Sequence, residues 1–195
     1  MPPKIKITKE EIMNGAICIV REEGFERLNA RDLAKRIGCS VHPIFREYSS
    51  MDALKNEVYK TAEEIYNKRM LSTIENSTEG FLNMGLAYIN FAKTEKYLFQ
   101  LLFMSDAFQE NSIMDIVGTT EGDDEVIQMI CQSTGLKNQS AKELYTGIWL
   151  TTHGIASMLA TNNCGFSAKE IKRLLSNSYF GLLEMLQREE EKGYE

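Results

Sequence analysis

Apolar residues recur three or four positions apart along nearly the whole chain, which is the spacing of amphipathic helices. The sequence contains no alternating stretches of β-branched residues bounded by turn pairs, the pattern typical of half-buried strands. Only three prolines occur in the chain, and no linker-like tract separates one part from another. We therefore expect an all-α fold in which a continuous helix joins the N-terminal part to the rest.

The N-terminal part carries the start and stop signals of short helices. Thr8 followed by Glu11 forms a capping box that begins a first helix, and Gly24 ends that helix. Asn29 caps a second, shorter helix, which ends at Gly38. These signals predict two helices separated by a tight connection.

A third helix is expected from Val41 to about Tyr48, with Ser40 as its cap. Its apolar residues Ile44 and Tyr48 lie four positions apart and can anchor one face. Two short helices with a glycine-containing turn between them, preceded by a longer helix, form the helix-turn-helix plan. In that plan the second short helix presents its N-terminal residues to the base edges of DNA. We therefore interpret residues 1–50 as a three-helix DNA-binding domain.

The remainder, residues 51–195, is expected to form a second, helical domain. Its helices are expected from residue 51 onward, over 81–92 and 97–104, as two short helices around a loop within 112–130, and over 140–160 and 167–191. The last two are joined by a short turn, so we expect them to pack antiparallel. Two long amphipathic helices at the end of a chain offer a symmetric surface, since a pair from each subunit makes a four-helix bundle. The alternative is that they only close the core of one subunit.

The charge is distributed unevenly along the chain. The whole protein has a formal net charge of −6, but residues 1–60 carry eleven Lys and Arg against nine Asp and Glu. The head is therefore slightly basic and the body acidic, which lets the head approach phosphates while the body repels them. The asymmetry agrees with a DNA-binding head without proving it.

Other functional classes find little support in the sequence. The first residues lack the apolar core and small-residue cleavage site of a secretory signal, and no apolar run is long enough for a membrane span, so we expect a cytoplasmic protein. The four cysteines form no CxxC pair and no cluster with metal-ligand spacing, and we expect reduced, mostly packed thiols, with redox sensing as the alternative. We expect no metal, cofactor or catalytic residue. The cysteines are Cys18, Cys39, Cys131 and Cys164.

Four elements of the head keep a fixed spacing: GF at 24–25, ARDLAKRIGCS at 30–40, IFREY at 44–48, and Leu54. In these residues the chain resembles the head of the tetracycline-repressor (TetR) family of transcriptional regulators. The resemblance covers about the first quarter of the chain. It implies a recognition helix within residues 1–50 and an aromatic residue near the end of that helix that touches a phosphate. It also implies that residues 51–195 form a helical domain for effector binding and dimerisation.

Carried over position by position, the resemblance places Arg31 at the DNA from the start of the second helix. It places four successive residues toward the major groove and an aromatic residue behind them: Ser40, Val41, His42, Pro43 and Phe45. Arg31 and Arg46 stand at the ends of the two helices that meet the groove, so we expect them to contact a phosphate or guanine, with solvated surface charges as the alternative. The chain departs from the family pattern at three of its positions. Phe45 stands where the family usually has a tyrosine, Met51 where it often has a phosphate-binding lysine, and Val41 where it often has a polar or basic residue.

The segment WLTTHGIA at 149–156 resembles the W…HG signature of one C-terminal subgroup of TetR-type regulators. Trp149 and His153 lie four positions apart and share a helix face. An isolated histidine on such a face is more often a hydrogen-bonded structural residue than a catalytic one. The alternative is an effector pocket with one polar anchor, lined by Tyr88, Phe91, Phe103, Tyr145, Trp149 and His153.

Two functions follow from this reading. The favoured one is a ligand-responsive repressor that binds a palindromic operator as a homodimer through its last two helices and is released by a small, largely apolar effector. The alternative is a helical enzyme or interaction module with a degenerate helix-turn-helix head. The sequence has no metal cluster, nucleophile–base pair or phosphate-binding loop, which weighs against an enzyme.

Overall fold

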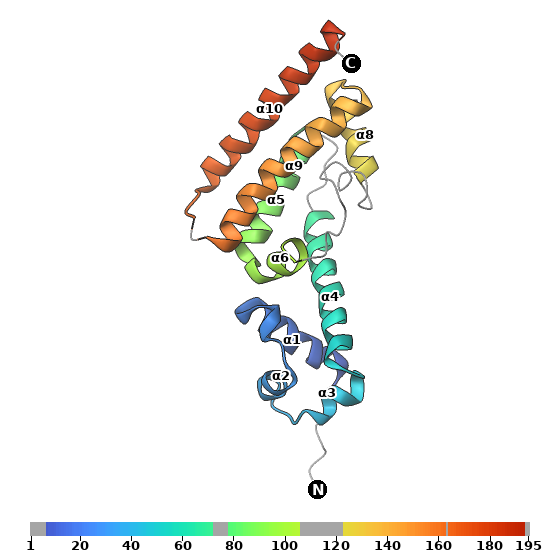
Figure 1. Ribbon diagram of the computed structural model, residues 1–195, viewed down its shortest axis with the longest axis vertical. Helices are drawn as coiled ribbons and strands as arrows, with labels where there is room; N and C mark the ends of the chain where they lie inside the picture. Colours follow the sequence, from blue (N-terminus) through green and yellow to red (C-terminus); the bar gives the residue numbers. More distant parts are fainter. Residues whose placement is uncertain (1–6, 72–77, 106–122, 163, 194–195) are drawn as a thin grey trace. The chain divides into compact units, whose positions relative to one another are not determined.

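The computed structural model describes residues 7–71, 78–105, 123–162 and 164–193, and within these ranges all regular secondary structure is helical (Figure 1). This confirms the all-α fold expected from the sequence. The helices are α1 (Lys9–Glu23), the 3₁₀ turn η1 (Phe25–Arg27), α2 (Ala30–Arg36), α3 (His42–Glu47), α4 (Met51–Leu71), α5 (Thr78–Thr94), α6 (Lys96–Phe103), α8 (Asp123–Thr134), α9 (Asn138–Thr161) and α10 (Ala168–Lys192).

The chain forms two compact units, and α4 runs without a break from the first into the second. The first unit contains the chain up to Asn67 together with Glu95–Ser105, and the second contains Lys68–Thr94 and the chain from residue 106 on. The expected joining helix is therefore confirmed. The compact units assign α6 to the head, whereas the expected domains 1–50 and 51–195 divide the chain by function, and that division stays a prediction.

The local signals of the head form as expected. The Thr8 hydroxyl accepts a hydrogen bond from the Glu11 amide at 3.1 Å, and the Glu11 carboxylate accepts from the Thr8 amide at 2.7 Å. Asn29 Oδ1 accepts from the first amides of α2. Gly24 and Gly38 end their helices with φ of +93° and +72°, a conformation that side chains other than glycine's disfavour.

The sequence-based prediction of a Ser40 cap on the third helix is wrong. Val41 is the N-cap of α3, and it makes no side-chain cap hydrogen bond. Its backbone already has the right-handed helical conformation, with φ −68° and ψ −18°. A serine side chain caps a helix by accepting a hydrogen bond from an amide of the first turn, and Ser40 is separated from His42, the first residue of α3, by Val41. The Ser40 carbonyl instead accepts a hydrogen bond from the Cys39 thiol at 3.0 Å.

The first unit has its own apolar core, to which α6 contributes. Ile12, Leu33, Ile44 and Leu54 are fully buried, one each from α1, α2, α3 and α4. Helix α6 packs on α1 and η1, and its apolar residues Leu98, Phe99, Leu101 and Leu102 are buried, as expected for a helix with almost no polar face. The head is thus a four-helix core with a fifth helix brought in from later in the chain.

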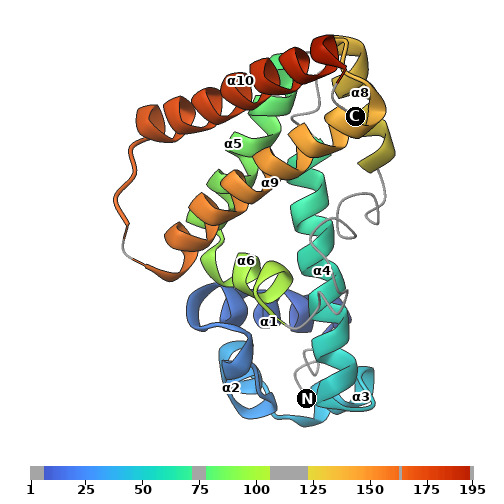
Figure 2. The same cartoon turned by 45° about the horizontal axis from the view of Figure 1, so that its top comes forward.

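The second unit is built around the packing of α5, α9 and α10, with α8 against α5 and α9. Helices α9 and α10 run antiparallel, as predicted (Figure 2). Ser167 and Glu170 form a complete capping box at the start of α10. The buried residues that share this core are Ile127, Ile130, Leu136, Ala141, Leu144, Ile148, Tyr179 and Leu186.

The expected pair of short helices within 112–130 falls only in part on the described chain. Residues 106–122 lie outside it, and the remainder of that segment belongs to the single helix α8, which continues to Thr134. None of the helices in the described ranges has the length and apolar character needed to cross a membrane.

Candidate functional site

The inner face of α3 is fixed to the head, and this determines which of its side chains point outward. Ile44 is fully buried, and Tyr48, the C-cap of the helix, is 4% exposed. The ammonium group of Lys9 lies 5.3 Å from the centre of the Tyr48 ring and pairs with Glu57 at 2.7 Å. Burial, together with the charge of Glu57, raises the pKa of Tyr48 to about 12, so its hydroxyl is neutral at any physiological pH.

The outer face of α3 holds the residues expected to read DNA. Ser40 and His42 are exposed, Val41 and Pro43 are half-buried, and Phe45 is 47% exposed. Because the anchors face the core, this outer face is held in one orientation. The residues that the sequence predicts to face the groove thus lie together on one surface segment, although their contact with DNA stays a prediction.

The two arginines expected at the DNA lie in different surroundings. Arg31 is exposed in the first turn of α2. Arg46 donates one hydrogen bond to the Ile7 carbonyl at 2.9 Å and another to Glu47 at 3.0 Å. Arg46 therefore ties α3 to the segment before α1, and fewer of its donors can reach a phosphate than for a fully solvated arginine.

Three of the expected effector residues form one group between α5 and α9. The Tyr88 hydroxyl lies 2.9 Å from His153 Nδ1, and the Trp149 ring stacks on the His153 ring with centroids 5.0 Å apart and planes 7° from parallel. Burial lowers the pKa of His153, so its imidazole is neutral near pH 7. The group thus combines two aromatic side chains with a neutral imidazole, and its role in binding an effector stays a prediction.

The other expected effector residues have different neighbours. Phe91 is fully buried, with the Arg69 guanidinium 5.7 Å from its ring centre. Phe103 belongs to the first unit, where its ring lies 4.9 Å from that of Tyr66. Tyr145 donates a hydrogen bond to Asp123 Oδ1 at 2.7 Å.

Sequence reasoning missed Asp123, which is only 6% exposed. The buried residues Ile127 and Ile130 follow it at helical spacing, and this spacing would have placed residue 123 on the inner face of α8. A buried carboxylate therefore lies in the second unit, hydrogen-bonded to an aromatic residue of α9.

The four cysteines are free thiols. Cys18 is exposed on α1, whereas Cys39, Cys131 and Cys164 are partly buried. Burial raises the pKa of Cys39, which keeps it in the less reactive thiol form. The expectation of mostly packed thiols is met by three of the four.

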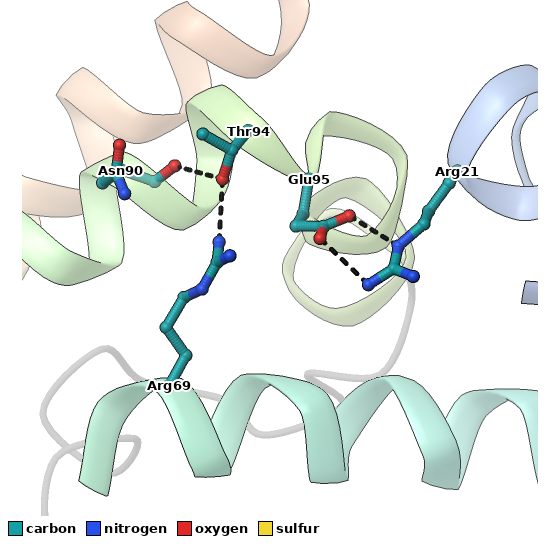
Figure 3. Close-up of polar contacts among 5 residues, drawn as sticks. All are labelled: Arg21, Arg69, Asn90, Thr94 and Glu95. Atoms are coloured by element: carbon teal, nitrogen blue, oxygen red, sulfur yellow. Dashed lines mark hydrogen bonds and ion pairs between the residues drawn. The ribbon is translucent and has the colours of Figure 1, made fainter. Parts of the chain in front are cut away.

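A second feature missed by sequence reasoning is the junction between α5 and α6, drawn in Figure 3. Thr94, the last residue of α5, accepts a hydrogen bond from Arg69 of α4 at 2.8 Å and donates one to the Asn90 carbonyl. The next residue, Glu95, forms a two-pronged ion pair with Arg21 of α1, at 2.8 and 3.0 Å. Two consecutive residues are thus tied to two different helices, one contact within each compact unit.

The Arg21→Ala variant is expected to lower the free energy of unfolding by about 1 kcal/mol, because the Glu95 side chain, only 14% exposed, loses a paired charge. Urea denaturation followed by circular dichroism measures this. The matched control is Arg188→Ala, which removes an ion pair to Glu184 whose two side chains are both about two-thirds exposed. The control is expected to change stability by less than about 0.5 kcal/mol. Equal losses in the two variants would contradict a structural role for the Glu95 pair.

The chain resembles known proteins in its structure but matches none of those compared by sequence. No family model matches the chain, and no curated protein matches it. A TetR-like transcriptional regulator from Rhodococcus sp. RHA1 aligns with a TM-score of 0.65 and 14% identity, over 94% of this chain and 98% of that one. A variant of TetR from Acinetobacter baumannii AYE, in complex with minocycline, aligns with a TM-score of 0.53 and 16% identity, over 95% and 98% of the two chains.

Both alignments span the head and the body, so the likeness is not limited to the helix-turn-helix. The order of a longer helix, two short helices, a joining helix and a helical body agrees with the arrangement that the head's residues implied. The chain therefore has the fold of the TetR-like transcriptional regulators.

Proposed function

We propose that this protein is a transcriptional regulator that binds DNA through α3. The observation that carries the proposal is the arrangement of α3 itself. Its buried residues Ile44 and Tyr48 anchor it to the head. Ser40, just before the helix, and His42 and Phe45, within it, are exposed. This is the arrangement in which a recognition helix enters the major groove.

We further propose that the protein acts as a homodimer through α9 and α10. Large apolar side chains are exposed on both helices of the single chain: Leu150 and Met158 on α9, and Leu174, Phe180 and Met185 on α10. Gly154 lies on the same side of α9 as Leu150 and Met158, four residues from each, and nothing described lies within 4 Å of where its Cβ would be. An apolar stripe with a glycine at its centre favours close approach of a second helix.

A dimer has two α3 helices related by a two-fold axis, so the proposed operator is a palindrome with half-sites roughly 34–36 Å apart. The proposed regulation is release by a small molecule bound in the second unit, which biases the dimer toward head positions that fit the operator less well. The aromatic group around His153 supports a largely apolar effector. A minocycline complex of a protein with this fold gives independent support for a small-molecule ligand. Placement in the W…HG subgroup is part of the same proposal.

A gel-shift assay with the upstream region of the protein's own gene tests the function. The wild-type chain is expected to bind in a saturable, salt-dependent way, and Arg31→Ala to weaken binding about tenfold, because an exposed cation in the first turn of α2 is lost. Lys93→Ala is the matched control, since Lys93 is an exposed cation near the end of α5. It is expected to leave binding unchanged.

Failure of the wild-type chain to bind any DNA fragment at low salt would overturn the proposal. It would favour the alternative, a helical enzyme or interaction module with a degenerate head. If the two substitutions weakened binding equally, the affinity for DNA would depend on the net charge of the protein rather than on a contact made by the head.

A further inference from the structure

The outer face of α3 carries a short apolar strip formed by Val41 and Phe45. The Phe45 amide donates a hydrogen bond to the Val41 carbonyl at 3.2 Å, so the two residues lie one helical turn apart on the same side. Within the described residues of α1 to α3, Phe45 is the one large apolar side chain with such high exposure, at 47%. A solvent-exposed phenylalanine beside a valine is unfavourable in the free protein, and a partner surface that covers both would remove that cost.

The polar groups that could hydrogen-bond to bases from α3 are few. Arg46, the strongest donor on the helix, is held by the Ile7 carbonyl and Glu47. Val41 and Phe45 have no side-chain donor or acceptor. Ser40 and His42 are the remaining exposed polar residues at the reading end. Hydrogen-bonded readout by this helix is therefore limited to a small part of its outer face.

In the major groove one base offers an apolar group. Adenine, guanine and cytosine present nitrogen and oxygen donors or acceptors there, whereas thymine also presents its 5-methyl group. Valine and phenylalanine side chains against a donor or acceptor would leave that group dehydrated and unpaired. The same side chains against a methyl group bury apolar surface on both sides.

We propose that Val41 and Phe45 are specificity-determining residues that read thymine methyl groups, so that each operator half-site carries an A·T pair with its thymine against this strip. The inference rests on the proposed DNA binding through α3. It adds that the selected base is thymine and that the selection comes from apolar contact with its methyl group. The occupant of the strip is thus double-stranded DNA, and its contact is apolar rather than hydrogen-bonded.

The test replaces thymine with deoxyuridine, which removes the methyl group and keeps every base-pairing atom. Binding sites are first selected from a random double-stranded library with the full chain. Each thymine of the selected half-site is then replaced in turn, and affinity is measured by fluorescence anisotropy at one salt concentration of about 100 mM. At the thymine that faces the strip, affinity is expected to fall about fourfold for each methyl group removed, the effect of exposing one methyl-sized apolar group.

The same titration is then run with the Val41→Ala/Phe45→Ala double variant. This variant is expected to bind the normal operator more weakly and to lose its response to the methyl group, with less than about a 1.5-fold change on replacement, since nothing is left to cover it. A thymine in the spacer between half-sites is the control, at which neither protein is expected to respond. Both side chains are outside the core, so the variant is expected to keep the melting temperature of the wild-type chain.

Three outcomes overturn the inference. Selected sites without a shared thymine, a wild-type response below about 1.5-fold at every thymine, or an equal response in the double variant would each show that another group reads the base. In all three the protein still binds DNA, so the proposed function stands. A chain that selects no sequence and binds no DNA overturns the proposed function and this inference together.

Discussion

The Leu150→Glu/Met185→Glu double variant is expected to be a folded monomer that binds the operator about a hundredfold or more weakly than the wild-type chain. Leu150 is 42% exposed and Met185 46% exposed in the single chain, so glutamates there stay in water and leave the subunit intact. In an interface between α9 and α10 of two subunits, each would be buried as an unpaired charge, on both sides of the two-fold axis. A monomer engages one half-site and loses the gain from linking two.

Sedimentation or light scattering measures the subunit count of this variant, and anisotropy its affinity. The matched control is Gln128→Glu, which adds a negative charge at an exposed position of α8. That control is expected to keep both the dimer and the affinity. A double variant that remains a dimer would place the interface elsewhere and remove α9 and α10 from the proposal.

The Gly15→Val variant is expected to destabilise the head by about 2 to 3 kcal/mol and to abolish operator binding at the temperature where the head unfolds. Gly15 is buried in α1 where α2 crosses closely. A Cβ at this position would lie 2.5 Å from Ile37 Cγ2 and 3.1 Å from Leu33 Cδ1. The Ile37 methyl is bonded directly to Cβ, so it moves only with the side chain's first torsion or with the backbone of α2.

Asn14→Ala is the control for this experiment, because residue 14 is an exposed neighbour in the same helix. It is expected to change stability by less than about 0.5 kcal/mol. Thermal and urea unfolding followed by circular dichroism give the comparison. A Gly15→Val variant as stable as the control would mean that α1 and α2 separate without loss, and that the close crossing contributes nothing.

Local signals in the sequence predicted the head well because each depends on neighbours along the chain. The capping box at Thr8, the Asn29 cap and the left-handed glycines at 24 and 38 involve residues at most three or four positions apart. The error at Ser40 is of the same local kind. The sequence placed the cap at Ser40 because a polar side chain before a proline-containing turn is a typical start signal. In the structure α3 begins at His42, and Val41 is its N-cap.

Contacts between distant residues could not be predicted in this way. Glu95 and Arg21 are 74 positions apart, and their pairing depends on α6 lying against α1. The tie between Arg46 and the Ile7 carbonyl likewise spans 39 positions, so sequence spacing gave no sign that this arginine is engaged. The aromatic group of Tyr88 and His153 was partly foreseen, because Trp149 and His153 share a helix face, but its partner on α5 was one of several candidates.

The unbroken length of α4 determines how far one end of the helix moves when the helix tilts. Its 21 residues correspond to a rod about 30 Å long. Tilting such a rod by about 5° displaces its far end by roughly 2.6 Å, which approaches the 3.4 Å rise between base pairs. Because two copies would move in opposite senses in a symmetric pair, their displacements add. In the proposed dimer, a tilt of a few degrees in each copy of α4 is therefore enough to shift the two α3 helices relative to one another by more than one base-pair rise.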